Sequence, residues 1–181
     1  MTNYGDIWLT QNTALKCIKS NDTLNYQYVQ NTNDNYPYVT YVSIYYFDFD
    51  SNNNKWLTTS KGLCKLDSNF NFINCDLDSN LRFTKIRIDN YDNKWMTTTS
   101  NDGLVRYNNG NWQIFNTSNS DIPSDTIFEI EVDTSENIWL ATNEGLTKYD
   151  GNTWVAYNME NSNIEDSYIQ LYILMNRILN G

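Results

Sequence analysis

Residues 133–158 read DTSENIWLATNEGLTKYDGNTWVAYN, and the fold of the 181-residue chain can be predicted from this segment. Short apolar runs alternate in it with turn signals made of Asp, Ser, Asn and Gly, a pattern typical of antiparallel hairpins. Asp150-Gly151 is a hairpin turn in which both central residues tolerate a positive φ. Together with the run that precedes it, the stretch predicts four strands, over residues 127–133, 138–143, 146–149 and 153–157.

The first of these strands alternates with a period of two, which predicts a β-strand and not a helix. We expect one face to carry Ile127, Glu129 and Glu131, and the other to carry Phe128, Ile130 and Val132. A sheet of four such short strands cannot bury an aromatic face by itself, so it needs further copies of itself to pack against.

The same pattern recurs along the chain, with one tryptophan in each of four copies. Successive indoles are separated by 48, 39 and 44 residues. An aspartate precedes the tryptophan by six residues in three copies. A small residue followed by leucine comes six or eight residues after it in all four, at Ala14, Gly62, Gly103 and Gly145. A position occupied once per repeat belongs to the scaffold, so we assign structural roles to Trp8, Trp56, Trp95, Trp139, Asp50, Asp89 and Asp133.

Repeats of about 40 to 45 residues with four strands each indicate a β-propeller. We therefore predict an all-β chain that forms a single β-propeller domain over residues 1–181, with about four four-stranded antiparallel blades. The approximate blades are residues 1–36, 37–78, 79–121 and 122–160.

Residues 163–181 admit two interpretations. Residues 167–176 align without gaps on residues 124–133, so they would supply the opening strand that the first copy lacks and close a four-bladed ring. The alternative is a C-terminal helix capped by Asn163, with Glu165 and Asp166 in its first turn, which would leave a partial propeller arc and serve as an oligomerisation or docking element.

Residues 133–158 also resemble the two-component regulator propeller repeat, which is found in the ligand-sensing regions of bacterial hybrid sensor kinases and in other surface propellers. The resemblance is close in the third and fourth copies, looser in the second and weak in the first. It implies a propeller fold and a recognition role, in which the repeat residues shape the blades and are not catalytic. Unlike the sensor proteins, the sequence shows no membrane span, kinase or DNA-binding part.

Charge and composition exclude several classes of function. A net charge of -10 and a pI near 4.3 repel phosphate backbones and anionic lipids, so we expect no nucleic-acid partner. No apolar run is long enough for membrane insertion, and the N-terminus does not read as a signal peptide. We therefore expect a cytosolic or virion-associated chain, or the mature part of an exported one. With no histidine, the chain lacks Ser-His and Cys-His triads and HExxH metal sites.

No cofactor or metal is expected. Cys17, Cys64 and Cys75 are odd in number and lack metal-ligand spacing, so we expect buried free thiols and neither a disulfide framework nor a zinc site. Asp48, Asp50, Asn52 and Asn54 alternate like calcium ligands, but the glycine and the distal glutamate of a calcium loop are missing. Because Asp50 recurs in other copies, we favour an aspartate that binds the backbone amides of a turn.

Function is expected where the copies differ, in the loops between their second and third strands. The candidate ligand-binding residues there are Asn12, Lys61, Asn101, Asp102, Asn143 and Glu144. Amide and hydroxyl groups, with Tyr36, Tyr38, Tyr45 and Tyr46 nearby, suit a carbohydrate or a protein surface.

We therefore predict a non-enzymatic recognition module that binds a carbohydrate or protein ligand through loops at one end of the propeller. The main alternative is a structural subunit of a larger phage or cell-surface assembly, in which residues 163–181 form a homo-oligomer or dock on the larger assembly. A glycan-active hydrolase or lyase would need a positioned pair of carboxylates, and no pair stands out from the repeat.

Overall fold

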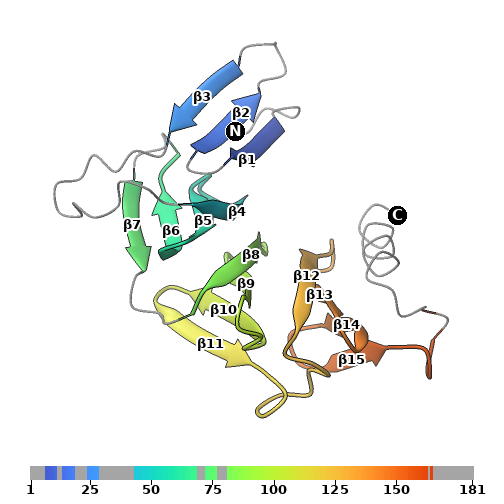
Figure 1. The fold of residues 1–181 in the computed structure, drawn as a ribbon. Coiled ribbons are helices and arrows are strands. Elements are labelled where there is room, and N and C mark those ends of the chain that lie inside the picture. Colours follow the sequence, from blue (N-terminus) through green and yellow to red (C-terminus); the bar gives the residue numbers. More distant parts are fainter. Residues whose placement is uncertain are drawn as a thin grey trace. The chain divides into compact units, whose positions relative to one another are not determined.

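The computed structural model describes residues 7–11, 14–18, 24–28, 43–68, 72–76, 81–162 and 164, with the side chains of residues 43–68, 73–75, 81–162 and 164. The regular structure in these ranges consists of fifteen β-strands in four antiparallel sheets. The strands are labelled in Figure 1. The described residues include no helix that could cross a membrane. The two interpretations of residues 163–181, and the assembly role attached to them, concern residues outside the described part apart from Ile164.

The first sheet has three strands and each of the others has four. The first contains β1 (Ile7–Gln11), β2 (Ala14–Ile18) and β3 (Leu24–Tyr28), and the second contains β4 (Ile44–Phe49), β5 (Lys55–Thr59), β6 (Gly62–Leu66) and β7 (Phe72–Asp76). The third contains β8 (Phe83–Ile88), β9 (Lys94–Thr98), β10 (Leu104–Asn108) and β11 (Asn111–Phe115), and the fourth contains β12 (Ile127–Val132), β13 (Ile138–Thr142), β14 (Gly145–Tyr149) and β15 (Trp154–Tyr157). In every sheet the strands lie side by side in chain order, which is the strand order of a propeller blade.

The chain divides into two compact units, Met1–Ile86 and Arg87–Gly181, and the division falls inside β8. The core of the first unit contains Ile44, Leu57, Cys64, Leu66 and Cys75. The core of the second unit draws on both the third and the fourth sheet, through Trp95, Leu104, Phe115, Ile122, Ile127, Ile130, Ile138, Leu140 and Tyr149. The aromatic face that one sheet cannot bury alone is therefore buried against the next sheet.

The alternation expected for β12 is wrong at the start of the strand. The register against β13 shifts between Ile127 and Glu129, so Phe128 is 37% exposed while Glu129 is only 5% exposed. The register between β4 and β5 shifts in the same way between Ile44 and Tyr46. A β-bulge adds a residue to one strand and re-aims the side chains beside it, which a strict period of two cannot anticipate.

An aspartate organises the turn between the first and second strands of a blade. In the third sheet, the carboxylate of Asp89 accepts hydrogen bonds from the backbone amides of Tyr91 at 3.0 Å and Asn93 at 2.8 Å. It also accepts one from the side-chain amide of Asn93 at 2.6 Å and one from Nε1 of Trp95 at 2.8 Å. One buried carboxylate thus fixes the turn and the recurring indole together.

The second and fourth sheets repeat this arrangement. Asp50 accepts from Nε1 of Trp56 at 3.0 Å, and Asp133 accepts from Nε1 of Trp139 at 2.8 Å. Burial by itself raises the pKa of each carboxyl group, but the hydrogen bonds from the turn and the indole outweigh it, so the pKa values of Asp50 and Asp133 lie below the usual range. Both carboxylates are therefore charged acceptors at neutral pH, and their contribution to folding is lost only when they are protonated.

A cation covers each of these indoles from the neighbouring strand. Trp95 faces Arg106 across the β9–β10 pair, and the guanidinium lies 5.6 Å from the ring centroid. Lys65 lies 5.1 Å from the ring of Trp56, and Lys148 lies 5.7 Å from the ring of Trp139, at the equivalent cross-strand positions. The tryptophan is the part of the repeat that stands out in the sequence, but the unit that recurs in these three sheets is an aspartate, an indole and a cation.

Two of the three cysteines form a disulfide, so the expectation of free thiols is wrong for them. Cys64 and Cys75 are direct cross-strand partners in β6 and β7, and their sulfur atoms are bonded. The β6–β7 register shifts between Lys65 and Leu66, and this irregularity sets which residue of β7 faces Cys64. The side chain of Cys17 lies outside the described residues.

We expect the double variant Cys64→Ala/Cys75→Ala to lower the free energy of unfolding by about 2–3 kcal/mol, because the bond closes a short loop and restricts the unfolded chain. Urea unfolding monitored by tryptophan fluorescence measures the difference. Dithiothreitol should cause a similar loss in the wild-type chain and none in the double variant. Equal stability of the wild-type chain with and without reductant would contradict the disulfide.

Candidate functional site

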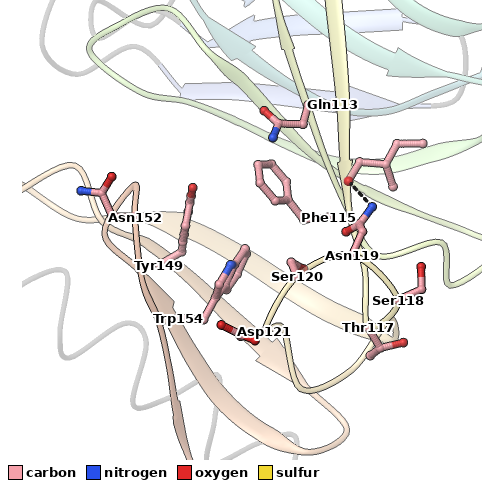
Figure 2. A pocket seen from close by; sticks show the side chains of 11 residues that line it. Gln113, Phe115, Thr117, Ser118, Asn119, Ser120, Asp121, Tyr149, Asn152 and Trp154 are labelled. Carbon is pink, nitrogen blue, oxygen red and sulfur yellow. Dashed lines mark hydrogen bonds between the residues drawn. The ribbon is translucent and has the colours of Figure 1, made fainter.

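The second unit contains an open groove of about 820 Å³. Figure 2 shows that its side chains come from three segments: strand β11, the loop that follows it, and the β14–β15 hairpin. The lining residues are Gln113, Ile114, Phe115, Thr117, Ser118, Asn119, Ser120, Asp121, Tyr149, Asn152 and Trp154. The groove therefore combines an aromatic floor with a rim of amide, hydroxyl and carboxylate groups.

The floor is a stack of aromatic rings. Trp154 lies parallel to Tyr149, with ring centroids 4.2 Å apart and planes at 19°. Phe115 closes the third side, 5.8 Å from Trp154 and 5.6 Å from Tyr149. Phe115 and Tyr149 are buried in the core, whereas Trp154 is half-buried and lines the groove. The core thus holds the indole of Trp154 in one orientation before any ligand arrives.

The loop after β11 is fixed by its own polar groups. The backbone amide of Asn116 donates to Oδ1 of Asn119 at 2.9 Å, and the amide of Ser120 donates to the carbonyl of Asn116 at 2.9 Å. Asn119 Nδ2 also donates to the carbonyl of Ile114 at 2.9 Å, the bond drawn in Figure 2. Ile122 then anchors the loop in the core. The rim residues of this loop are therefore presented on a rigid backbone.

The opposite rim is set by the turn between β14 and β15. The carboxylate of Asp150 accepts hydrogen bonds from the backbone amides of Thr153 at 2.8 Å and Asn152 at 2.9 Å. These bonds lower the pKa of Asp150 to about 2, so the turn stays locked at any pH near neutrality. Burial raises the pKa of Tyr149, whose hydroxyl donates to the carbonyl of Gly151 at 2.7 Å. Asn152 is thereby placed at the edge of the groove.

Three polar side chains of the rim are not used by the fold. Within the described part of the chain, the side-chain amides of Gln113 and Asn152 and the carboxylate of Asp121 have no hydrogen-bond partner, and all three are exposed. The side-chain donors that line the groove from the loop after β11 form hydrogen bonds within the loop, with β11 or with Asp125. Gln113, Asn152 and Asp121 are therefore the rim groups available to a ligand, and none of them stands at a predicted site.

The loop residues predicted from the sequence lie elsewhere. Lys61 is exposed between β5 and β6, and Asn101 and Asp102 lie between β9 and β10. Asn143 and Glu144 form the β13–β14 turn, where Asn143 Oδ1 accepts a hydrogen bond from the hydroxyl of Ser124. These five residues stand in the turns of three different sheets, none of them lines the groove, and Asn12 lies outside the described residues. Their role in binding stays a prediction.

No metal centre accompanies the groove. Within the ranges that the structure describes, no three acidic or cysteine side chains are grouped so that they could hold an ion. In the calcium-like segment, the carboxylate of Asp50 accepts hydrogen bonds from the backbone amides of Asn52 and Asn54 and from Nε1 of Trp56.

The sequence carries a signal for this groove that a search for strands misses. A second tryptophan recurs in the last strand of the third and fourth sheets, as Trp112 and Trp154. Each lies directly opposite a tyrosine of the preceding strand: Trp112 opposite Tyr107, and Trp154 opposite Tyr149. The loop recurs too: Asn116, Asn119, Ser120 and Ile122 return 42 residues later as Asn158, Asn161, Ser162 and Ile164. The amide of Asn158 again donates to Oδ1 of Asn161 at 2.9 Å.

Comparison with known proteins places the fold. No protein-family model matches the sequence, and no curated protein matches it. Solved structures do match: a streptogramin B lyase aligns with 90% of this chain at 15% identity and a TM-score of 0.66. The extracellular domain of a putative hybrid two-component system from B. thetaiotaomicron aligns with 92% of it at 19% identity and a TM-score of 0.66. The fold is a β-propeller.

This likeness covers only part of the other chains. The alignment takes in 54% of the streptogramin B lyase, 55% of the virginiamycin B lyase of Staphylococcus aureus and 23% of the two-component extracellular domain. The chain therefore spans about half the length of the two lyases. Identities of 12 to 19% show the shared propeller fold and do not carry a function with them.

Proposed function

We propose that this chain is a non-enzymatic recognition module of the two-component regulator propeller type, and that it binds a carbohydrate in the groove between β11 and β15. The observation that carries the proposal is the half-buried indole of Trp154, held by Tyr149 beneath a rim of unused polar groups. A flat aromatic ring binds the apolar face of a sugar, while amides and carboxylates bind its hydroxyl groups.

The chemistry of the chain supports binding without catalysis. The virginiamycin B lyase of Staphylococcus aureus has been solved as a variant that is catalytically inactive because a histidine is replaced by alanine. This chain contains no histidine, so it cannot supply that side chain. Within the groove, Asp121 is the one carboxylate among the lining residues, whereas hydrolysis of a glycosidic bond needs two.

We expect Trp154→Ala and Gln113→Ala each to weaken carbohydrate binding by about tenfold or more, the factor that corresponds to about 1.4 kcal/mol. A glycan array identifies the ligand, and isothermal titration calorimetry measures the affinities. Gln113 is exposed and outside the core, so its variant tests binding even if Trp154→Ala unfolds. Val155→Thr serves as the control, because Val155 is exposed on the same strand and does not line the groove.

Two results would contradict the proposal. One is an array without a carbohydrate ligand, combined with capture of a peptide or protein whose affinity Trp154 and Gln113 still control; the module would then recognise protein. The other is a carbohydrate ligand whose affinity is unchanged in both variants, which would place the site elsewhere, for example at the predicted turns.

A further inference from the structure

A second hollow of about 240 Å³ lies on the β10–β11 hairpin, and strand β11 also lines the groove. Its lining residues are Arg106, Asn108, Asn109, Asn111 and Gln113, all on β10, β11 or the turn between them. Gln113 lines both hollows. The two are therefore neighbours along one surface, and a ligand that fills the first can reach the second.

The strand register shows how the two hollows are connected. Cross-strand partners on the β10–β11 hairpin are Leu104 with Phe115, Arg106 with Gln113, and Asn108 with Asn111. Alternate residues of a strand point to the same face, so these three pairs form one continuous strip. The strip begins at the aromatic floor, passes Gln113 and ends at the asparagines of the hairpin turn. From Phe115 to Asn111 it covers about 13 Å, more than one sugar ring.

Arg106 is held in place for a ligand. Its guanidinium lies over the ring of Trp95, and its Nε donates to Oδ1 of Asn93 at 3.0 Å. Asn93 is itself fixed by the carboxylate of Asp89. Among the described residues this is the one hydrogen bond of the Arg106 side chain, so its two terminal nitrogens keep their donors. A guanidinium anchored through Nε presents a fork that matches a carboxylate.

The charges of the two hollows are separated. Among the described residues, Arg106 is the charged residue that lines the second hollow, and Asp121 is the charged residue that lines the first. Because the chain carries a net charge of -10, an anionic ligand is repelled over most of the surface and accepted only where a cation is exposed to it. An acidic group is therefore favoured at the Arg106 end and disfavoured beside Asp121.

We propose that the groove binds a linear oligosaccharide of at least two residues, with a neutral sugar on Trp154 and a carboxylate-bearing sugar at Arg106. This inference rests on the proposed function and adds the class and the orientation of the ligand. Gln113 lies directly opposite Arg106 and binds a hydroxyl group near the junction of the two sugars. Asn111 lies beyond this pair, towards the hairpin turn, and binds a hydroxyl group of the acidic sugar. The asparagine-rich lining suits sugar hydroxyl groups better than apolar peptide side chains.

The test uses an array of trisaccharide pairs, in which one member has a single terminal uronic acid and the other is the same compound with that carboxyl reduced. We expect an acidic member to bind the whole chain about tenfold more tightly than its neutral counterpart. Arg106→Gln should abolish this preference, and Arg106→Lys should retain part of it, since lysine keeps the charge and loses the fork. Lys148→Gln is the matched control, because Lys148 occupies the equivalent position over Trp139 and lies outside both hollows.

The outcomes separate this inference from the proposed function. Equal binding of acidic and neutral trisaccharides, with affinity still dependent on Trp154 and Gln113, overturns the acidic-ligand inference and leaves carbohydrate recognition standing. A preference for the acidic member that Arg106→Gln and Lys148→Gln reduce equally reflects overall charge and also overturns it. Failure to bind any glycan overturns both. Urea unfolding of each variant checks that a lost preference is not a lost fold.

Discussion

The Gly103→Ala substitution is expected to destabilise the chain by about 3–5 kcal/mol, a loss at the upper end for a single methyl group. Gly103 has a φ of +91°, which alanine adopts only with strain. A Cβ atom at this position would also lie 2.2 Å from the carbonyl oxygen of Phe115 on the neighbouring strand. The oxygen belongs to a backbone held in the β10–β11 ladder, so it cannot move aside without breaking pairing.

Gly110→Ala separates the two causes. Gly110 also has a positive φ, +85°, but nothing lies within 4 Å of a Cβ added there. We expect this control to cost about 1–2 kcal/mol from backbone strain alone. Gly145→Ala and Gly151→Ala repeat the comparison in the fourth sheet, where the added Cβ of Gly145 would lie 2.3 Å from the carbonyl oxygen of Tyr157. Urea unfolding measures all four, and equal losses within each pair would contradict the steric explanation.

The Asp89→Ala substitution is expected to cost a similar amount, about 3–5 kcal/mol. It removes the acceptor for two backbone amides, the side-chain amide of Asn93 and the indole of Trp95. Asn93 and Trp95 are buried, at 7% and 4% exposure, so their donors cannot turn to water. A buried donor without a partner costs far more than an intact hydrogen bond contributes.

Asp121→Ala is the control for this prediction, because it removes the same carboxylate from an exposed position without partners among the described residues. Its effect on the free energy of unfolding should stay within about 0.5 kcal/mol. Trp95→Phe isolates the indole bond by keeping a ring and removing Nε1, and should fall between the two. The turn network would be refuted as a source of stability if Asp89→Ala and Asp121→Ala unfolded at the same urea concentration.

The Gly-Leu and Asp signals of the repeat have a common origin in local geometry. Gly103 and Gly145 follow the turn between the second and third strands, where a positive φ and a close neighbouring carbonyl leave no room for a side chain. Asp89 and Asp133 bind amides two and four residues ahead, within a single turn. These requirements involve only a few neighbouring residues, so the glycine and aspartate positions can be recognised in the sequence.

Two other features, the exposure of Phe128 and the disulfide, could not be predicted from the sequence, and the reason is again physical. The exposure of Phe128 depends on a bulge in β12, and the pairing of Cys64 with Cys75 depends on an irregularity between β6 and β7. In both places a shift of one residue changes which side chains share a face. Neither shift has a distinctive residue type, so the sequence pattern predicted strict alternation and free thiols.

Strand period and turn chemistry are local, so the strands, their turns, the propeller fold and the recurring aspartate and tryptophan could be predicted from the sequence. The groove could not, because it forms through packing between sheets. Gln113 and Trp154 are 41 residues apart and meet because two sheets bury their aromatic faces against each other. The polar groups that keep no hydrogen-bond partner in the groove depend on how neighbouring sheets pack. The sequence of one repeat does not contain this information.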